Sequence, residues 1–401
     1  MQIKSTLKQL IKNNPLYKDF IRPMRIKLKE KALAKLDDES YFIKRHKQIF
    51  GYTPDFKNPQ TFNEKIIHRI LFDRNPIYTA LADKLKARIY IATTLQHFNP
   101  THNTQDNTIY TTGGGQPYSL NQNNINLQNN PTLNTTTSTT PQTQNKDSIL
   151  AKDSLLFQPI DTLTQELFNT NECQYLPKLY GIYKSVNEID FSKLPQSFVL
   201  KTNHDCGGVV LVKDKDTFLK DSKSFNEAIT KLTTHLNTNF YTLYREWHYK
   251  DIEPRIFAEE MLLDGTKDPD TYKFHIFQGL EDHYIQLTAD RFTNYKRTIL
   301  DKDWQLAPFG FLYDNTNNPI PPKPSELEHL KRLAFVLSQM FDYVRVDLYY
   351  MPFAKGQKIV VGELTFTHAC GTERLVPESW DKKLGNMWKH TSYNRGSDEG
   401  K

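Results

Sequence analysis

Several features are scarce or missing in this 401-residue sequence, and each absence argues against a class of protein. Only three cysteines occur, Cys173, Cys206 and Cys370, and this odd, scattered set argues against a disulfide framework. No run of about 18 apolar residues is present, so the sequence predicts no membrane-spanning helix. The first residues lack the apolar stretch and the cleavage site of a signal peptide, and we expect a cytoplasmic protein.

Recognisable catalytic and metal motifs are also few. No Ser/His/Asp signature of nucleophilic catalysis stands out. Two His-X-Cys triplets, 204–206 and 368–370, are candidates for a zinc site. Structural zinc ligands usually stand two to four residues apart within each pair, so this spacing is poor and we expect free thiols instead.

Positive charge is concentrated at the N-terminus. Residues 1–47 hold thirteen Lys and Arg against five Asp and Glu, a net +8, whereas the whole chain is +6. Such a basic segment can lie on an anionic membrane surface. The alternative is a solvated helix that packs one apolar side on the main domain. Pro15 and Pro23 interrupt the segment and few aromatic residues anchor it, which favours the second interpretation.

Composition divides the chain into segments. Residues 99–146 hold eleven Asn, twelve Thr and six Gln with only two charged side chains. This stretch cannot bury enough apolar surface to offset its ordering entropy, so it predicts a disordered insertion in a loop. We therefore expect a basic helical segment at 1–50, a main domain at 51–390 and a loose polar tail at 391–401.

Within the main domain, apolar periodicity predicts helices. We expect one over 66–72, a second that begins near Thr79 with apolar residues continuing at helical spacing to Ile89, and a third over 224–236. Ser325 and Glu328 form a capping-box pattern that predicts the start of a fourth helix. Its expected buried stripe consists of Leu327, Leu330, Ala334 and Leu337.

Alternating and β-branched runs predict strands of antiparallel sheet at 255–265, 272–277 and 282–291. A hairpin is predicted over 198–212, where Lys201 lies just before the tip and Gly207–Gly208 let the tip approach a ligand closely. A Gly-Gly pair near a lysine is by itself only a weak phosphate-binding signal.

A second hairpin is predicted over 341–371, where two β-branched and aromatic runs flank turn-forming residues. Residues two apart in a strand share a face, so Arg345 points the same way as Asp347, and Glu363 the same way as Thr365. Pairing of the strands would bring two carboxylates and a hydroxyl beside a cation. That set suits Mg²⁺, and Arg345 could hold a phosphate or acyl oxygen. The alternative is a half-buried hairpin whose polar face meets water.

Six short phrases follow one another in a fixed order: Thr61–Lys65, Ala82–Lys84 with Arg88, Phe198–Asn203, Tyr272–Phe274, Val344–Tyr349 and Gly362–Phe366. Together they resemble the ATP-grasp enzymes. They are most similar to the ATP-grasp family associated with teichuronopeptide and capsular polysaccharide biosynthesis. The resemblance covers residues 52–388 apart from the insertion. It implies an α+β ATP-grasp fold, in which two lobes of antiparallel or mixed sheet with helices clamp ATP.

The resemblance assigns a nucleotide role to several residues. It implies that Lys201 binds α/β-phosphate oxygens and that the Gly207–Gly208 tip folds over the phosphates. Arg88 would reach the phosphates from the other lobe, and Glu260 would lie at the interlobe hinge, near the adenine and ribose. Lys273 completes the implied nucleotide-binding set.

The same resemblance assigns the second hairpin to catalysis. Asp347 and Glu363 match the Mg²⁺-binding carboxylates. Thr365 stands where many ATP-grasp enzymes have Asn, and its hydroxyl can still ligate Mg²⁺. Arg345 matches the arginine that steadies the transferred phosphoryl group, where fixed positive charge lowers the barrier, and Lys201 assists it as a second catalytic residue.

The implied activity is ATP- and Mg²⁺-dependent ligation of a carboxylate to an amine through an acylphosphate. The implied acceptor is a uronic acid or peptide carboxylate of a cell-surface or capsular polysaccharide, and the implied donor is an amino acid. We expect no nucleic-acid partner. Peripheral contact with the cytoplasmic face of the membrane is expected only through the basic N-terminus.

Three other functions compete with this interpretation. A glycosyltransferase that uses a nucleotide-sugar would also need carboxylates and a metal, often as Asp-X-Asp. The triplets at 214–216, 268–270 and 301–303 do not follow an evident buried parallel strand. A kinase-like phosphorylation of a sugar or peptide would use the same ATP constellation. A non-catalytic membrane-surface scaffold would leave the six ordered phrases unexplained.

Overall fold

The computed structural model describes residues 35–96, 98, 154–264, 267–278, 282–289, 296–315, 319–354 and 358–389. The expected insertion at 99–146, the tail at 391–401 and most of the basic N-terminal segment lie outside the described residues. Within the described ranges, no helix combines the length and the apolar character needed to cross a membrane.

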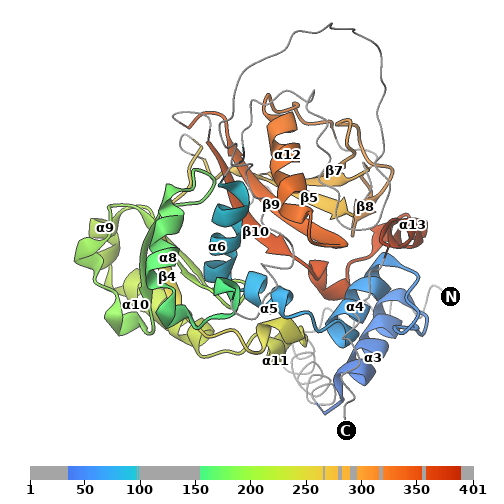
Figure 1. Cartoon of the computed structure of the whole chain (residues 1–401), viewed down its shortest axis with the longest axis horizontal. Helices are drawn as coiled ribbons and strands as arrows, with labels where there is room; N and C mark the ends of the chain where they lie inside the picture. Colours follow the sequence, from blue (N-terminus) through green and yellow to red (C-terminus); the bar gives the residue numbers. More distant parts are fainter. Residues whose placement is uncertain are drawn as a thin grey trace, which may run out of the picture.

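Two antiparallel sheets form the centre of the structure (Figure 1). The smaller sheet has the order β1–β4–β2–β3, with bounds β1 Leu179–Tyr183, β2 Phe198–Thr202, β3 Val209–Val212 and β4 Ile256–Glu259. The larger sheet has the order β10–β9–β5–β6–β7, with bounds β5 Asp270–Phe277, β6 Tyr284–Ala289, β7 Lys296–Leu300, β9 Tyr343–Met351 and β10 Lys358–Thr365. A short pair adds β8 Gly310–Phe311 and β11 Leu375–Val376. The expected α+β class and both expected hairpins are confirmed.

Helices cover both sheets. They are α3 Asp38–Phe50, α4 Phe62–Phe72, α5 Pro76–Ala82, α6 Lys84–Leu95, α8 Thr164–Asn169, α9 Lys215–Lys220, α10 Ser222–Leu236, α11 Tyr241–Tyr244, α12 Leu327–Ser338 and α13 Ser379–Met387. In Figure 1, α9 and α10 lie at the smaller sheet, α12 lies across the larger sheet, and α6 lies between the two. The helices expected near 66–72 and 224–236 correspond to α4 and α10.

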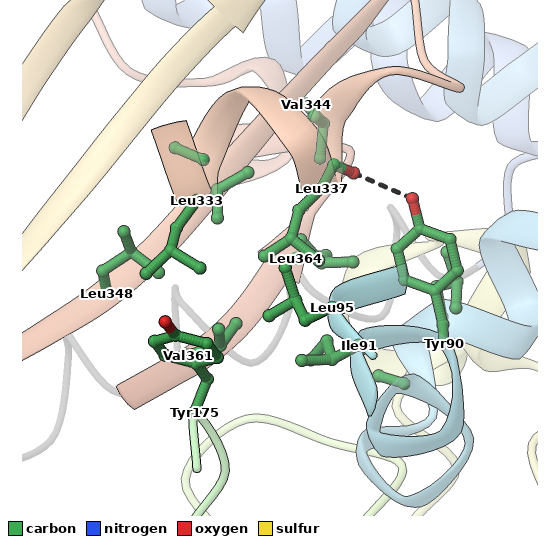
Figure 2. Packing of buried hydrophobic residues seen from close by; sticks show 14 of the residues in the cluster. Tyr90, Ile91, Leu95, Tyr175, Leu333, Leu337, Val344, Leu348, Val361 and Leu364 are labelled. Carbon is green, nitrogen blue, oxygen red and sulfur yellow. Dashed lines mark hydrogen bonds between the residues drawn. The ribbon is translucent and has the colours of Figure 1, made fainter. Parts of the chain in front are cut away.

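The main core lies between α6, α12 and one face of the larger sheet (Figure 2). The predicted stripe of α12 is fully buried there, and Leu337 also accepts a 2.9 Å backbone hydrogen bond from the Tyr90 hydroxyl of α6. A second core joins α3, α4 and α13 to one end of the opposite face, through Tyr343 and Phe277. A third packs α10 on the smaller sheet. Apolar burial on these faces is the main term that stabilises the fold.

Two local predictions are wrong. The single helix expected from Thr79 to Ile89 is two helices, α5 and α6. Asp83 has extended backbone angles between them, and its carboxylate accepts from the Leu85 backbone N–H as the N-cap of α6. The expected capping box at Ser325 does not form either, because α12 begins one residue later with Glu326 at its N-cap. The Ser325 hydroxyl instead bonds the Tyr350 hydroxyl at 2.8 Å.

Candidate active site

Strand alternation on β9 separates a core face from a polar face. Val344, Val346 and Leu348 are fully buried in the main core beneath α12. Arg345 and Asp347 lie between them in the sequence, so their side chains project from the opposite face of the sheet. The strand therefore carries charged groups on one face while its other face packs in the core.

A β-bulge at Gly362 puts Glu363 on the same polar face. The β9–β10 register shifts between Val361 and Glu363, so one extra residue interrupts the alternation of β10. Val361 and Leu364, three apart, therefore both face the core. A Cβ on Gly362 would lie 2.8 Å from the Tyr349 ring, which favours glycine at this position.

The register arranges the polar residues in two cross-strand rows. Lys273 of β5 lies opposite Asp347, which lies opposite Glu363 of β10. In the next row, His275 lies opposite Arg345, which lies opposite Thr365. Three adjacent strands thus bring together five of the predicted site residues. They are Lys273, Arg345, Asp347, Glu363 and Thr365.

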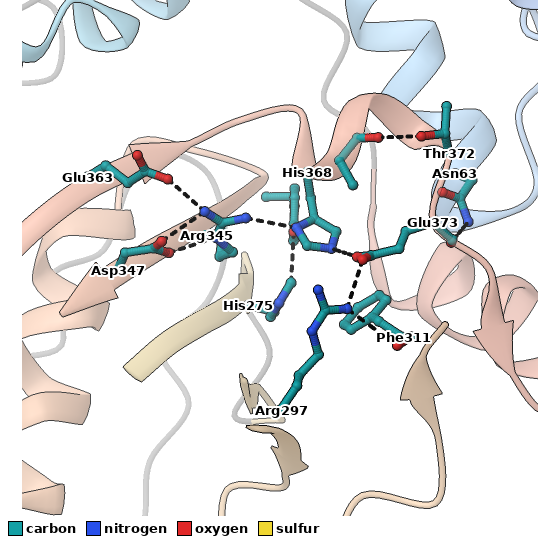
Figure 3. Close-up of polar contacts among 12 residues, drawn as sticks. Asn63, His275, Arg297, Phe311, Arg345, Asp347, Glu363, His368, Thr372 and Glu373 are labelled. Atoms are coloured by element: carbon teal, nitrogen blue, oxygen red, sulfur yellow. Dashed lines mark hydrogen bonds and ion pairs between the residues drawn. The ribbon is translucent and has the colours of Figure 1, made fainter. Parts of the chain in front are cut away.

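Arg345 is the centre of this group, as Figure 3 shows. Its guanidinium donates to both carboxylate oxygens of Asp347, at 2.6 and 2.8 Å, and to Glu363 Oε1 at 2.7 Å. Asp347 also accepts from the Lys273 ammonium at 2.5 Å, and Thr365 donates to Glu363 Oε1 at 2.9 Å. The predicted catalytic arginine is therefore held by both predicted metal-binding carboxylates.

Neighbouring positive charges keep the Glu363 carboxylate ionised. Desolvation alone would raise the pKa of Glu363, but Arg345, Lys273 and Lys84 outweigh it and lower that pKa to about 2. The Glu363 side chain is also 46% exposed, so water screens it more than it screens Asp347. Burial disfavours the charge on Arg345, yet Asp347 and Glu363 raise its pKa well above its usual value. Glu363 and Arg345 therefore both carry their charges near neutral pH.

On the smaller sheet, two cations share one carboxylate. Lys201 of β2 and Arg88 of α6 both pair with Glu259 of β4, Arg88 at 3.5 Å. Arg88 also donates to the Pro177 carbonyl at 2.7 Å, so its side chain is buried against the start of β1. The group holds one net positive charge. Lys201 lies where the sequence predicted, and Arg88 as a phosphate ligand stays a prediction.

The loop between β2 and β3 carries the predicted glycine tip. Gly207 has a φ of +104°, and a Cβ on Gly208 would lie 1.9 Å from the Thr202 hydroxyl, so both positions require glycine. Asp205 bonds the Thr202 hydroxyl and the His235 ring of α10, which fixes the loop on its scaffold. The described loop is compact, and the predicted contact of its tip with phosphates stays a prediction.

Glu260 lies where the two sheets connect. Its carboxylate accepts two hydrogen bonds from Lys358 at the start of β10, at 2.6 and 2.7 Å. Its backbone N–H donates to the Lys178 carbonyl beside β1 at 2.8 Å. Glu260 therefore contacts residues of both sheets, while its hinge role and its contact with a nucleotide, both implied by the resemblance, stay predictions.

Sequence reasoning assigned no role to Lys84, although the quoted phrase Ala82–Lys84 contains it. The Lys84 ammonium bonds the Asp205 carbonyl of the β2–β3 loop, and its backbone N–H donates to the Asn203 carbonyl at 3.1 Å. Burial lowers the pKa of Lys84, while Glu363 and Asp205 act in the opposite direction and Lys201 adds repulsion. Lys84 therefore lies within electrostatic range of charged residues from both sheets.

The donor set on the larger sheet fits Mg²⁺. Asp347, Glu363 and Thr365 offer only oxygen atoms, which this hard cation prefers, and the first two lie directly opposite one another on paired strands. No group of three or more His, Cys, Asp or Glu side chains that could hold a metal occurs among the described residues. Mg²⁺ is usually bound through one or two carboxylates with water and substrate phosphates, so this small set suits it.

Sequence comparison identifies the family. The model of the TupA-like ATP-grasp proteins matches residues 169–389, more than half of the chain, and this segment contains both sheets. The chain belongs to the TupA-like ATP-grasp family. It is thus a member of the ATP-grasp ligases, which use ATP and Mg²⁺ generally. Comparison with curated proteins found no match.

Solved structures similar to this TupA-like chain include other ATP-grasp proteins. D-alanine–D-alanine ligase from Bacillus anthracis, complexed with ATP, is 15% identical, with 62% of this chain and 74% of that chain covered and a TM-score of 0.28. The corresponding ligase from Helicobacter pylori is 13% identical, with 56% of each chain covered and a TM-score of 0.28. The ATP-grasp ligase PsnB, with minimal precursor, Mg and ADP, is 13% identical, with 57% and 58% covered and a TM-score of 0.28. This chain spans less than two thirds of the last two, and the family assignment rests on the sequence match alone.

Proposed function

We propose that this TupA-like chain is an ATP- and Mg²⁺-dependent carboxylate–amine ligase. The single observation that supports it best is the cross-strand row Lys273–Asp347–Glu363 with Arg345 bonded to both carboxylates. This row offers oxygen ligands for a metal and two fixed cations for phosphate oxygens, side by side on one sheet face. Such a set meets the main demands of phosphoryl transfer, which are positioning and charge neutralisation.

The nucleotide would lie between the two sheets. In this proposal, Lys201, Lys84 and Arg88 bind phosphate oxygens from the smaller sheet and α6, and the Gly207–Gly208 tip covers them. Support comes from the charge balance, because Lys201 and Arg88 share one carboxylate and Lys84 adds a further cation. Glu260 would contact the ribose or adenine near the connection between the sheets.

Asp347, Glu363 and Thr365 would hold Mg²⁺, which when bound neutralises charge on the phosphate oxygens. The acceptor carboxylate oxygen attacks the γ-phosphorus, the bond to ADP breaks, and an acylphosphate results. Arg345 steadies the phosphoryl oxygens during this step. The amine then attacks the acyl carbon, phosphate leaves, and the nitrogen loses its proton to give the amide. No protein nucleophile is required.

The acceptor follows from the family resemblance. We propose a uronic acid or peptide carboxylate on a cell-surface or capsular polysaccharide, with an amino acid as donor, and a cytoplasmic location. Contact with the membrane surface would involve the basic N-terminal segment, most of which lies outside the described residues. We also propose that residues 51–390 form one catalytic domain around the insertion.

Calorimetry of the full-length chain with Mg·ATP and with a Mg·UDP-sugar tests the nucleotide site. We expect micromolar binding of Mg·ATP, lost in Lys201→Ala and retained in Lys213→Ala, an exposed lysine just past β3 that serves as the control. Preference for the UDP-sugar, with indifference to Lys201, would contradict the proposal in favour of a glycosyltransferase.

A second assay tests the reaction class. Uronic-acid oligosaccharides are incubated with Mg·ATP and either an amino acid or hydroxylamine, which captures acylphosphates as hydroxamates. We expect ADP together with an amide or a hydroxamate. ADP with a phosphorylated sugar and no hydroxamate would indicate a kinase instead.

A further inference from the structure

The turn that follows β10 has an unusual backbone. Ala369, Cys370 and Gly371 have φ values of 48°, 54° and 62°, three successive residues in the left-handed region. Only glycine adopts this region without steric cost, so the turn is strained at two residues. Three hydrogen bonds close it: the Cys370 N–H donates to the Thr367 carbonyl at 2.9 Å, the Thr372 N–H donates to the Ala369 carbonyl at 3.1 Å, and the Thr372 hydroxyl donates to the same carbonyl at 2.8 Å. Figure 3 shows the bond of the Thr372 hydroxyl.

Helix α4 holds this turn in place. A Cβ on Gly371 would lie 2.6 Å from Ile67 and 2.8 Å from the Asn63 carbonyl oxygen, so the turn packs directly on the helix. The Asn63 amide also donates to the Glu373 carbonyl at 3.0 Å. Strained backbone persists only where surrounding contacts determine it, and such strain is concentrated at functional sites.

The turn presents His368 to Arg345. The Arg345 Nη1 donates to His368 Nδ1 at 2.9 Å, and His368 Nε2 bonds Glu373 Oε2 at 2.8 Å. Since a guanidinium has only donors, Nδ1 must accept and the ring proton must lie on Nε2, where it is donated to the carboxylate. Arg297 donates to the other oxygen of Glu373 at 2.7 Å. Burial lowers the pKa of His368 despite the opposing effect of Glu373, in agreement with a neutral ring.

We propose that His368, oriented by Glu373 and the left-handed turn, is a positioning residue that fixes the Arg345 guanidinium for phosphoryl transfer. This inference rests on the proposed function of Arg345. Asp347 and Glu363, the other partners of Arg345, are also the proposed Mg²⁺ ligands, so their oxygens would turn toward the metal when it binds. His368 is a contact of Arg345 that does not depend on the metal. The buried Glu373 anchors it and is itself paired with the partly buried Arg297.

Two matched variants each remove a different hydrogen bond of His368, either the one to Arg345 or the one to Glu373. In His368→Asn, the side-chain oxygen takes the place of Nδ1 and can accept from Arg345, while the bond to Glu373 is lost. In His368→Gln, the amide nitrogen takes the place of Nε2 and can donate to Glu373, while the bond to Arg345 is lost. Both variants remove one bond and the ring, so a purely structural role predicts similar effects for the two.

The measurement is the affinity of the full-length chain for Mg·ADP with fluoroaluminate, which mimics the transferring phosphoryl group, divided by its affinity for Mg·ATP. Mutation of a partner that orients a metal-ligating side chain typically costs about 10- to 100-fold in metal affinity or activity, and we take the same range for a partner that orients a guanidinium. We expect His368→Gln to reduce this ratio by about that factor. His368→Asn should keep the ratio within a few-fold. Thermal melting and Mg·ATP affinity show that each variant is folded.

Arg345→Lys in the same assay distinguishes a failure of the proposed function of Arg345 from a failure of the positioning role of His368. If Arg345→Lys keeps the wild-type ratio, the proposed function of Arg345 is wrong, and the role of His368 fails with it. A different result would overturn only the positioning role of His368. In that result, Arg345→Lys lowers the affinity ratio, while His368→Asn and His368→Gln change it by the same factor, and the proposed function stands.

Discussion

The two faces of the larger sheet are built from the same strands, yet they serve opposite purposes. On β9, Val344, Val346 and Leu348 are fully buried against α12, whereas Arg345 and Asp347 make charge-assisted hydrogen bonds across the other face. Ion pairs between neighbouring side chains fix the polar face, whereas close packing of apolar side chains fixes the other face. The difference shows how one strand can both stabilise the fold and hold charged groups in place, because successive side chains point to opposite faces of the sheet.

The two ends of the polar face also differ in how far they are covered. At one end, Tyr343 packs its ring 5.1 Å from Phe62 of α4 and 4.6 Å from Trp388, measured between ring centroids. At the other end, Glu363 is close to half exposed. The covered end anchors the strands against α4 and α13, so the charges at the open end stand on a rigid support. Substitutions on the two faces should therefore change different quantities.

The largest effect is expected on catalysis, from Arg345→Lys. Lysine keeps the positive charge but cannot reproduce the fork that bonds Asp347, Glu363 and His368 together. Loss of one such stabilising group typically lowers a rate by about 10²–10³-fold. We expect that loss in ADP formation with the acceptor found by the oligosaccharide screen. Arg45→Lys on α3 is the matched control, and equal rates for the two variants would contradict the role of Arg345.

A stability effect is expected from Leu348→Ala on the core face. The side chain is fully buried in the main core, and truncation there should cost about 2–5 kcal/mol of unfolding free energy. Denaturant unfolding measures it, while Mg·ATP affinity of the folded protein should stay within a few-fold. Leu211→Ala, at an exposed leucine on β3, is the control and should change stability by less than about 0.5 kcal/mol. If Leu348→Ala lost more free energy of Mg·ATP binding than free energy of unfolding, the two faces of the sheet would not be independent.

The smallest effect concerns Glu246, a buried carboxylate outside the candidate site. Glu246 is buried and accepts a hydrogen bond from the Thr367 hydroxyl, and burial raises its pKa to about 7, unlike that of Glu363. Because the folded state holds this proton more tightly than the unfolded state, stability should fall as pH rises from about 4.5 to about 7. Glu246→Gln removes this penalty, so we expect it to be about 1–3 kcal/mol more stable than wild type at pH 8 and nearly equal at pH 4.5.

Denaturant unfolding at both pH values checks the prediction for Glu246. Glu227→Gln, at an exposed glutamate on α10, is the control and should behave as wild type at each pH. A stability difference between Glu246→Gln and wild type that stays constant across this pH range would show that Glu246 is ionised in the folded protein.

Much of the fold could be predicted from local sequence patterns. The two hairpins, the stripe of α12 and the opposite orientation of Arg345 and Val346 all follow from periodicities of two and about 3.6 residues. The break at Asp83 was missed because apolar residues keep helical spacing across it, although Asp is a strong N-cap residue. The capping box at Ser325 failed because tertiary contact with Tyr350 took its hydroxyl.

The candidate site was predictable only in part. The residue types and their spacing indicated Arg345, Asp347 and Glu363, but the bulge that turns Glu363 to their face depends on strand register, which one strand's sequence does not specify. Lys84 belongs to the motif Ala82–Lys84, but the sequence alone indicated no role for it. His368 and Glu373 were missed as a pair because their significance comes from long-range packing on α4, which leaves no local signal.

We propose above all that the polar face of the larger sheet binds a magnesium nucleotide. The most direct test is calorimetric titration of the full-length chain and of Asp347→Asn with ATP, with and without Mg²⁺. We predict that Mg²⁺ strengthens ATP binding to the wild type at least about tenfold. Asp347→Asn should lose this dependence and still bind ATP weakly through the smaller sheet. Equal Mg²⁺ dependence in both proteins would contradict it.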